Sequence, residues 1–389
     1  MITSVGLTGH AFPVIALGRE LGARGNEVWI ETSERWRDVV EGQGIEFVAA
    51  QEDIVAPGND GEGEGPSLAQ AAGSLVAPLR ELRPEVLVSD LFTLAPALAA
   101  EAAGVRRASL LHHPYPVSVR GRPPFPLGLL PPRTSLGART WRAMRPLLER
   151  RHRRGRRELN QVRAEVGLPP MERLHGAISE GLALVATFPQ LEYPRRWPSH
   201  VHVTGPMLFE PPSPEVVPPE GDDPLVVVAA STAQDPELTL VGAALEALQD
   251  ESVRVVATTS GRGAMWEGPV PGNAVVADWV SHSHVMADAA AVVCTGGHGT
   301  VARALADGVP VLVCPVGGDQ PENGARVAWA GVGLMLPRPL LGPGPLRRAV
   351  RRLLVDPRFA ARAREIAVWG RENSGSARGA ELVEAYARP

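Results

Sequence analysis

The chain has 389 residues, 44% hydrophobic and 21% charged, a composition typical of globular proteins, and its length predicts two domains, three at most. Its formal net charge of −4 gives no overall positive field, so we expect no nucleic-acid partner and no bulk attraction to an anionic membrane. All 39 basic residues are arginine, which excludes a Walker A phosphate loop and Schiff-base chemistry, because both require a lysine.

Cysteine content and the N-terminus bear on the compartment. Cys294 and Cys314 are too few for a disulfide framework or a cysteine zinc site, and they fit a reducing cytoplasm. We find neither a signal-peptide pattern nor a run approaching about 18 apolar residues, so we expect a cytoplasmic protein without membrane contact. The first predicted strand is short, which leaves open whether the native chain begins further upstream.

Short apolar strands alternate with helical patterns in the N-terminal half. The expected strands are Ile2–Val5, Glu27–Glu31, Val86–Ser89 and Ala108–Leu111, and the expected helices are one that Pro13 opens and one over Pro96–Ala103. Strands separated by helices in this way predict a parallel, doubly wound α/β sheet. The acidic, glycine-rich segment 58–65 is expected to be a flexible loop without assignable chemistry.

Residues 120–157 carry twelve arginines and end in the run Arg150–Arg157. Such runs are most often a solvated helical face or a mobile loop. The alternative is contact with an anionic surface such as lipid headgroups, because Trp141, Met144 and Leu148 share helical spacing.

Residues 205–224 include seven prolines in twenty positions, which is incompatible with a regular element. We therefore take this segment as a linker between an N-terminal domain, 1–204, and a C-terminal domain, 225–389, whose last helix is free to pack back on the first domain. The expected elements beyond it are strands at Leu225–Ala230, Val253–Thr258, Ala290–Cys294 and Val309–Cys314, and helices over Pro236–Gln249, over Thr300–Ala306 and from Asp356 onwards.

The turn Thr295–Gly299 joins a predicted strand to a predicted helix. Glycines let the backbone approach a ligand closely, and the unpaired N–H groups at the start of a helix suit phosphate. Asp319 and Gln320 follow the next strand at its carboxyl end, where open sheets bind ligands, and this pair can exchange hydrogen bonds with a polyhydroxyl group. Tight packing of the turn and an exposed loop for Asp319 and Gln320 are the alternatives.

Four segments resemble the donor-binding signature of family 1 glycosyltransferases of the GT-B fold and are most similar to bacterial natural-product (antibiotic) enzymes. They are Asp278–Val285, Gly296–Thr300, Ala304–Pro310 and Asp319–Gln320; Gly6–Pro13 and Arg24–Val28 resemble the start of the acceptor domain, and Gly205–Pro206 the linker. The resemblance implies two Rossmann-like domains whose parallel sheets face each other across a cleft.

In that family the histidine of the opening turn is the general base, here His10, and a carboxylate after a later strand orients it, here Asp90. The chemistry is consistent, because a neutral imidazole with a pKa near ~6.5 can accept a hydroxyl proton around neutral pH. Both residues are predicted at the carboxyl ends of parallel strands, so they can line one crevice. A local hydrogen bond for His10 and a helix N-cap for Asp90 are the alternatives.

For the donor, the resemblance implies that Trp279 lies against the nucleobase, the glycine-rich turn against the diphosphate, and Asp319 and Gln320 against the sugar. The predicted donor-binding residues are Ser231, Thr232, Trp279, Thr295, Gly296, Gly297, His298, Gly299, Thr300, Asp319 and Gln320. The predicted acceptor-binding residues are His112, His113 and Tyr115, and the proline-rich segment 123–132 is a further candidate wall. Core packing is the alternative for Trp279.

Two departures from the family pattern bear on the donor. The family turn begins His-Gly-Gly, whereas Thr295 stands first here, so the phosphate contact falls to Thr295 or His298. A glutamate that binds ribose hydroxyls in the family is replaced by Arg303. A deoxyribose lacks the 2′-hydroxyl that such a glutamate would engage, which favours a dTDP-sugar over a UDP-sugar.

Together these features predict an inverting, metal-independent glycosyltransferase that moves a sugar or deoxysugar from a nucleoside diphosphate to a hydroxyl of a hydrophobic natural-product aglycone. No Asp-x-Asp motif offers a metal site, and we expect no metal and no cofactor beyond the sugar nucleotide. The alternatives are a nucleotide-sugar epimerase of the same architecture, a peripheral-membrane glycolipid glycosyltransferase and a non-catalytic binding protein. A homodimer is left open.

Overall fold

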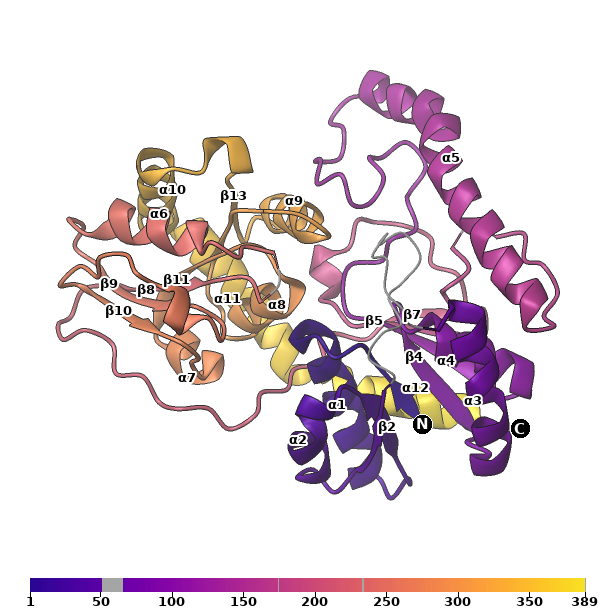
Figure 1. Cartoon of the computed structure of the whole chain (residues 1–389). Coiled ribbons are helices and arrows are strands. Elements are labelled where there is room, and N and C mark those ends of the chain that lie inside the picture. The colour runs from indigo at the N-terminus through magenta and orange to yellow at the C-terminus, as the bar shows by residue number, and fades with distance from the viewer. Residues whose placement is uncertain (51–65, 174, 233, 389) are drawn as a thin grey trace.

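The computed structural model describes residues 1–50, 66–173, 175–232 and 234–388, and the acidic segment 58–65 lies outside them. Two α/β domains, each built on a parallel sheet, lie side by side (Figure 1). The sequence prediction of a two-domain, doubly wound fold is therefore confirmed. Between the domains, residues 204–224 contain no helix and no strand.

The N-terminal domain has a seven-stranded parallel sheet in the order β3-β2-β1-β4-β5-β6-β7. Its strands are β1 (Ile2–Thr3), β2 (Trp29–Thr32), β3 (Glu46–Ala49), β4 (Val86–Asp90), β5 (Arg106–Leu111), β6 (Leu182–Val185) and β7 (Val201–Val203). Its helices are α1 (Thr8–Ala23), α2 (Arg37–Glu41), α3 (Leu68–Leu82), α4 (Leu94–Ala103) and α5 (Ser135–Glu165), with 3₁₀ turns η1 (Glu34–Trp36) and η2 (Pro189–Leu191). Every residue of β4 and β6 is buried, as expected for central strands covered on both faces.

The C-terminal domain has a six-stranded parallel sheet in the order β10-β9-β8-β11-β12-β13. Its strands are β8 (Leu225–Ala229), β9 (Arg254–Thr258), β10 (Ala274–Ala277), β11 (Ala289–Cys294), β12 (Val311–Val313) and β13 (Gly333–Met335). Its helices are α6 (Thr239–Leu248), α7 (His282–Ala287), α8 (His298–Ala306), α9 (Gln320–Ala330), α10 (Pro343–Val355), α11 (Pro357–Glu372) and α12 (Gly375–Ala387), with η3 (Gly263–Met265) and η4 (Arg338–Leu340).

One predicted helix start is wrong. Pro13 lies inside α1, which begins at Thr8, because the backbone N–H groups of His10 and Ala11 already bond to the Leu7 carbonyl. Pro13 is the sixth residue of α1, in its second turn, and having no N–H it cannot donate to the carbonyl of Gly9 four residues earlier. His10 therefore lies in the first turn of a helix and not in a loop before it. The limits of the other predicted elements differ from the observed ones by up to a few residues; for example, α6 begins at Thr239 and not at Pro236.

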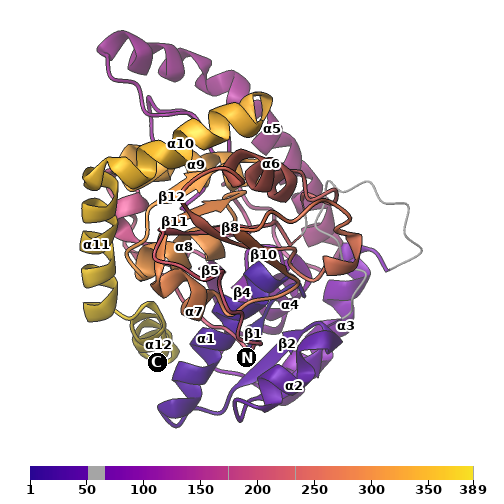
Figure 2. The ribbon, with the colours of Figure 1, turned by 90° about the vertical axis from the view of Figure 1, so that its left-hand side faces the viewer.

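The last helix returns to the first domain. α12 lies beside α1 (Figure 2), and its Ala380 and Val383 belong to the same apolar core as Leu17. At the linker, the backbone of Gly375 lies so close to Gly205 that a Cβ on Gly375 would meet the Gly205 carbonyl oxygen at 2.4 Å. The chain thus crosses between the domains twice, through the linker and again before α12.

Helix α5 projects from the N-terminal domain, and only its C-terminal part, around Leu159 and Val162, packs against the core of α3 and α4 (Figure 1). Its N-terminal part leaves Leu136 71% and Leu147 65% exposed. The part of segment 120–157 from Ser135 onwards therefore lies in a helix with exposed apolar side chains among its arginines, whereas residues 120–134 contain no helix.

Glu31, in β2, gives a prediction about stability and pH. Its side chain is buried, one carboxylate oxygen has no hydrogen-bond partner among the described residues, and burial raises its pKa from 4.5 to about 7. The unfolded carboxyl ionises near pH 4.5. The free energy of unfolding therefore falls as the pH rises from about 4.5 to about 7, and this loss is complete above pH 7. We expect Glu31→Gln to match the wild type near pH 4.5 and to exceed it by up to about 3 kcal/mol at pH 8. Urea unfolding at both pH values measures this; an equal difference at both would contradict it.

Candidate active site

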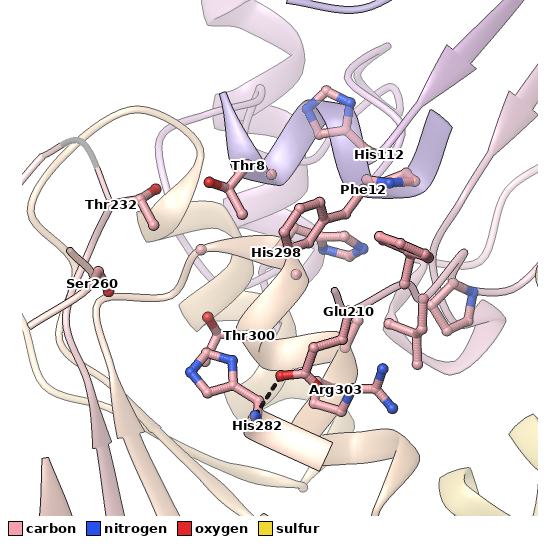
Figure 3. Close-up of a pocket in the computed structure, with 18 of the residues that line it drawn as sticks. Thr8, Phe12, His112, Glu210, Thr232, Ser260, His282, His298, Thr300 and Arg303 are labelled. Carbon is pink, nitrogen blue, oxygen red and sulfur yellow. Dashed lines mark hydrogen bonds between the residues drawn. The ribbon is translucent and has the colours of Figure 1, made fainter. Parts of the chain in front are cut away.

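A pocket lies between the two domains, with about 1140 Å³ of empty space that includes open solvent at its mouth. Figure 3 shows Thr8, Phe12 and His112 on one wall, from the N-terminal domain, and Thr232, Ser260 and Thr300 on the other, from the C-terminal domain. Of the predicted donor and acceptor residues, those that line it are His112, Ser231, Thr232, Trp279, Thr295, Gly297, His298, Gly299 and Thr300. A single ligand in this pocket would contact both domains.

His10 and Asp90 form a direct pair next to this pocket. His10 lies in the first turn of α1, directly after the pocket residue Gly9, and Asp90 is the last residue of β4. The His10 Nδ1 atom lies 2.6 Å from Oδ2 of Asp90, and the carboxylate is fully buried. The neighbouring strands β1 and β4 end at the same edge of the sheet, which brings the two residues together.

Asp90 is shared by a second imidazole. Nδ1 of His112, just after β5, lies 3.5 Å from Oδ1 of Asp90, and the His112 ring is centred 3.9 Å from that of His10. Burial lowers the pKa of His112 well below its usual value, so this ring is neutral at neutral pH. The sequence predicted His112 as an acceptor contact but gave no sign of its contact with Asp90.

The charge state of Asp90 fixes the tautomer of His10. Burial alone would raise the Asp90 pKa, but electrostatic interaction with the adjacent imidazoles of His10 and His112, with hydrogen bonds from His10 and the Phe92 N–H, lowers it to about 2. An ionised carboxylate only accepts hydrogen bonds, so Nδ1 of His10 carries the hydrogen. The Nε2 lone pair is then available to take a proton.

The glycine-rich turn forms the start of α8, which begins at His298, two residues before the predicted Thr300. Gly296 has φ +93°, and a Cβ there would lie 2.5 Å from Cγ1 of Val313, so packing requires this glycine. Nothing lies within 4 Å of a Cβ built on Gly297 or Gly299, which both line the pocket. No side chain caps the start of α8, and its first turn lines the pocket through Gly299 and Thr300, an arrangement suited to an anion.

His298 is buried and contacts the other domain. Its Nε2 lies 3.2 Å from the Ala186 carbonyl oxygen, and its Nδ1 lies 3.4 Å from Oδ1 of Asn323. The ring thus bridges the domains at the edge of the pocket. Thr295, the other predicted phosphate contact, is buried at the end of β11 and also lines the pocket.

The linker forms part of the pocket wall, which the sequence did not predict. The carboxylate of Glu210 accepts hydrogen bonds from the N–H groups of His282, drawn in Figure 3, and Ser283, at the start of α7. Trp279, the predicted base contact, donates from its indole nitrogen to Oγ of Ser213, 3.1 Å away. The only sequence signal for Glu210 was its place in the segment joining the domains.

Five of the predicted donor and acceptor residues lie outside the pocket lining: Gly296, Asp319, Gln320, His113 and Tyr115. Oε1 of Gln320 accepts the N–H groups of Val316 and Gly317, so this oxygen supports its own turn. Asp319 accepts from the amide of Asn323 at 2.9 Å. The predicted acceptor residues His113 and Tyr115 also contact other protein side chains. His113 is stacked on Phe125, and Tyr115 is buried with Trp197 against its ring.

Among the described residues, one cluster of side chains could hold a metal ion, and only after rearrangement. The ligand atoms of His10, Asp90 and His112 lie within 4.8 Å of one another. The 2.6 Å hydrogen bond between His10 and Asp90 would have to open to admit an ion. In the part of the chain that the structure describes, no helix has the length and apolar character needed to cross a membrane.

Comparison with known proteins identifies the family. Residues 242–385 match the family described as erythromycin biosynthesis protein CIII-like, C-terminal domain. The chain is 32% identical over 395 residues to 4'-demethylrebeccamycin synthase of Lentzea aerocolonigenes, covering 92% of each chain. It is 28% identical over 431 residues to O-mycaminosyltylonolide 6-deoxyallosyltransferase of Streptomyces fradiae, covering 99% of this chain and 97% of that one.

Solved structures have the same fold over the whole chain. The glycosyltransferase of kitacinnamycin superposes with a TM-score of 0.77 at 22% identity, covering 99% of this chain and 98% of that one. The glycosyltransferase VinC, crystallised with dTDP, gives a TM-score of 0.70 at 22% identity, covering 100% and 99%. The fold and the relatives lead to one assignment: the chain belongs to the GT-B natural-product glycosyltransferases with an EryCIII-like C-terminal domain.

Proposed function

We propose that this glycosyltransferase moves a sugar from a dTDP-sugar to a hydroxyl of a hydrophobic natural product, with inversion at the anomeric carbon and without a metal. The observation that carries the proposal is the placement of the His10–Asp90 pair next to a pocket whose opposite wall is the open first turn of α8. A base on one side and an anion site on the other suit direct displacement at a carbon between them. Membership of this family favours transfer over epimerisation.

In the proposed step, Nε2 of His10 takes the proton of the acceptor hydroxyl as its oxygen bonds to the anomeric carbon. The bond from that carbon to the phosphate oxygen breaks, and the nucleoside diphosphate leaves with the electron pair. Asp90 holds Nδ1–H and stabilises the imidazolium that forms. The N–H groups of Gly299 and Thr300, in the first turn of α8, would stabilise the charge growing on the leaving phosphate.

The thymidine nucleotide is supported by Arg303. This arginine lines the pocket where the family often has a ribose-binding glutamate, so a carboxylate partner for a 2′-hydroxyl is missing at that position. Crystallisation of VinC with dTDP is compatible with the same preference.

The buried, unpaired thiols of Cys294 and Cys314 fit our expectation of a reducing cytoplasm.

Thermal shift with the full-length chain tests the donor. We expect dTDP at 100 times its Kd to stabilise the protein by about 2.7 kcal/mol and to raise Tm, with UDP giving a smaller rise at equal concentration. NADH serves as the control nucleotide. A rise with NADH and none with dTDP or UDP would overturn the donor site, whereas an equal rise with UDP would overturn only the preference for thymidine.

A peripheral-membrane enzyme is the second candidate, and one observation favours it. The free part of α5 exposes Leu136, Met144 and Leu147 on one face while arginines flank it, as in helices that lie on anionic membranes. If so, the chain should co-sediment with vesicles containing phosphatidylglycerol and less with phosphatidylcholine alone. The double variant Leu136→Ser and Leu147→Ser should lose this binding; equal sedimentation with and without vesicles would leave α5 as a solvated helix.

A further inference from the structure

Arg326 lies on α9 of the C-terminal domain, yet most of its partners belong to the N-terminal domain. Its Nη1 donates to the Leu191 carbonyl at 2.9 Å and to the Glu192 carboxylate at 2.8 Å. Its Nε donates to Glu322, one turn earlier on α9, at 2.9 Å. The guanidinium carbon lies 3.9 Å from the centre of the Tyr193 ring, and only 2% of the residue is exposed.

A second contact holds the same N-terminal segment. His298, the first residue of α8, reaches the Ala186 carbonyl, six residues before Glu192. The segment 186–192, which follows β6 and includes η2, is therefore held by both α8 and α9. Figure 1 shows α9 on the side of the C-terminal domain that faces the N-terminal domain. Of the donor-side residues predicted from the sequence, α8 carries His298, Gly299 and Thr300, and α9 carries Gln320.

Glu192 extends this connection to the acceptor side. One carboxylate oxygen accepts from Arg326, and the other accepts the backbone N–H of Tyr115 at 2.6 Å. Tyr115 lies three residues after His112, which contacts Asp90. A chain of direct contacts thus runs from α9 through Arg326 and Glu192 to the segment beside the His10–Asp90 pair. Its middle members, Arg326 and Glu192, are both buried.

Such a connection determines relative position more than stability. A buried ion pair recovers little net free energy beyond its own desolvation, but its hydrogen bonds admit one geometry only. Displacement between a hydroxyl and an anomeric carbon needs the reacting atoms about 3–3.5 Å apart, and the two substrates would be held by different domains. A small shift of one domain would therefore separate them.

We propose that Arg326 and Glu192 are positioning residues that hold the acceptor-side segment after β5 in register with the donor-side helix α9. The pair fixes the distance between the domains in the folded enzyme. The consequence for catalysis rests on the proposed function, whereas the consequence for domain geometry does not. The two consequences are therefore separately measurable.

Three variants separate positioning from stability. Arg326→Met leaves the carboxylates of Glu192 and Glu322 buried without their partner, so we expect it to lower Tm. Combining it with Glu192→Gln and Glu322→Gln removes the unpaired charges and should restore Tm toward that of the wild type. Arg351→Met is the matched control, because Arg351 is 63% exposed and pairs with Glu251 inside the C-terminal domain.

The domain geometry is read by electron–electron spin distances in the full chain. Labels go on cysteines introduced at exposed Glu81 on α3 and exposed Arg348 on α10, since both native cysteines are buried. We expect one narrow distance in the wild type and in Arg351→Met. In the triple variant the distribution should be at least about twofold broader or shifted, although Tm has returned.

The proposal would be overturned if the triple variant had the wild-type distance distribution. It would also be overturned if the distribution in Arg351→Met were as broad as that in the triple variant. If Arg326→Met fails to fold, the triple variant still decides. The nucleotide is tested in parallel: dTDP should bind all variants with a Kd within about threefold of the wild type, because the open turn at Gly297 and Gly299 is unchanged. Failure of dTDP to bind even the wild type would overturn the proposed donor and leave the distance result standing.

Discussion

Replacing His10 by alanine is expected to lower kcat by about 10²–10⁴-fold while the Kd for dTDP stays near that of the wild type. His10 is the general base of the proposed step, and its Nε2 is free because Nδ1 is held by an ionised Asp90. The residue is not among those lining the donor pocket, so its loss removes proton transfer and leaves nucleotide contacts in place. Initial rates of dTDP release, with calorimetric binding of dTDP, separate the two effects.

The control for this variant is His200→Ala, because His200 lies just before β7, outside the pocket lining and outside the segments that resemble the donor-binding signature. It should leave both constants unchanged. Asp90→Asn should lower kcat in a similar range to His10→Ala, since an amide can present its N–H to Nδ1 and stabilise the wrong tautomer. Unchanged turnover in His10→Ala would remove this residue from the mechanism, even if nucleotide binding were confirmed.

The sequence predicted the parts of the site that a single strand–turn–helix unit determines. The family resemblance paired His10 with Asp90, and their places after β1 and at the end of β4 were consistent with it, because parallel strands bring their carboxyl ends to one edge of a sheet. The turn before α8 was recognisable for the same reason. The exact start of a helix was less predictable, because Pro13 suggested a boundary that the first turn of α1 does not follow.

Contacts between distant segments could not be predicted. Glu210 comes from the proline-rich linker and reaches α7, more than seventy residues later, without any periodic signal. Arg326 and Glu192 are separated by 134 residues, and nothing in the local pattern distinguishes this arginine from the other basic residues. Polar side chains such as Gln320 were expected to face a ligand, but its carbonyl oxygen instead accepts N–H groups of its own turn.

Two neighbouring glycines, Gly296 and Gly299, should respond in opposite ways to substitution by alanine, because only Gly296 is tightly packed against another segment. Gly296→Ala should lower the free energy of unfolding by about 2–5 kcal/mol, because an alanine at φ +93° is strained and its Cβ would overlap Val313. Gly299→Ala should leave stability unchanged or raise it by up to about 1 kcal/mol, because Gly299 lies in α8 with open space around it. Urea unfolding of both variants measures these changes.

Nucleotide binding should reverse this order. In Gly299→Ala the new methyl group stands in the pocket where the phosphates are proposed to lie, so the Kd for dTDP should rise by about tenfold or more even though the protein is stable. If Gly299→Ala bound dTDP like the wild type, the diphosphate would lie elsewhere in the pocket. If Gly296→Ala were as stable as the wild type, the turn would have an alternative backbone path, and its fixed N–H groups would no longer explain stabilisation of the leaving group.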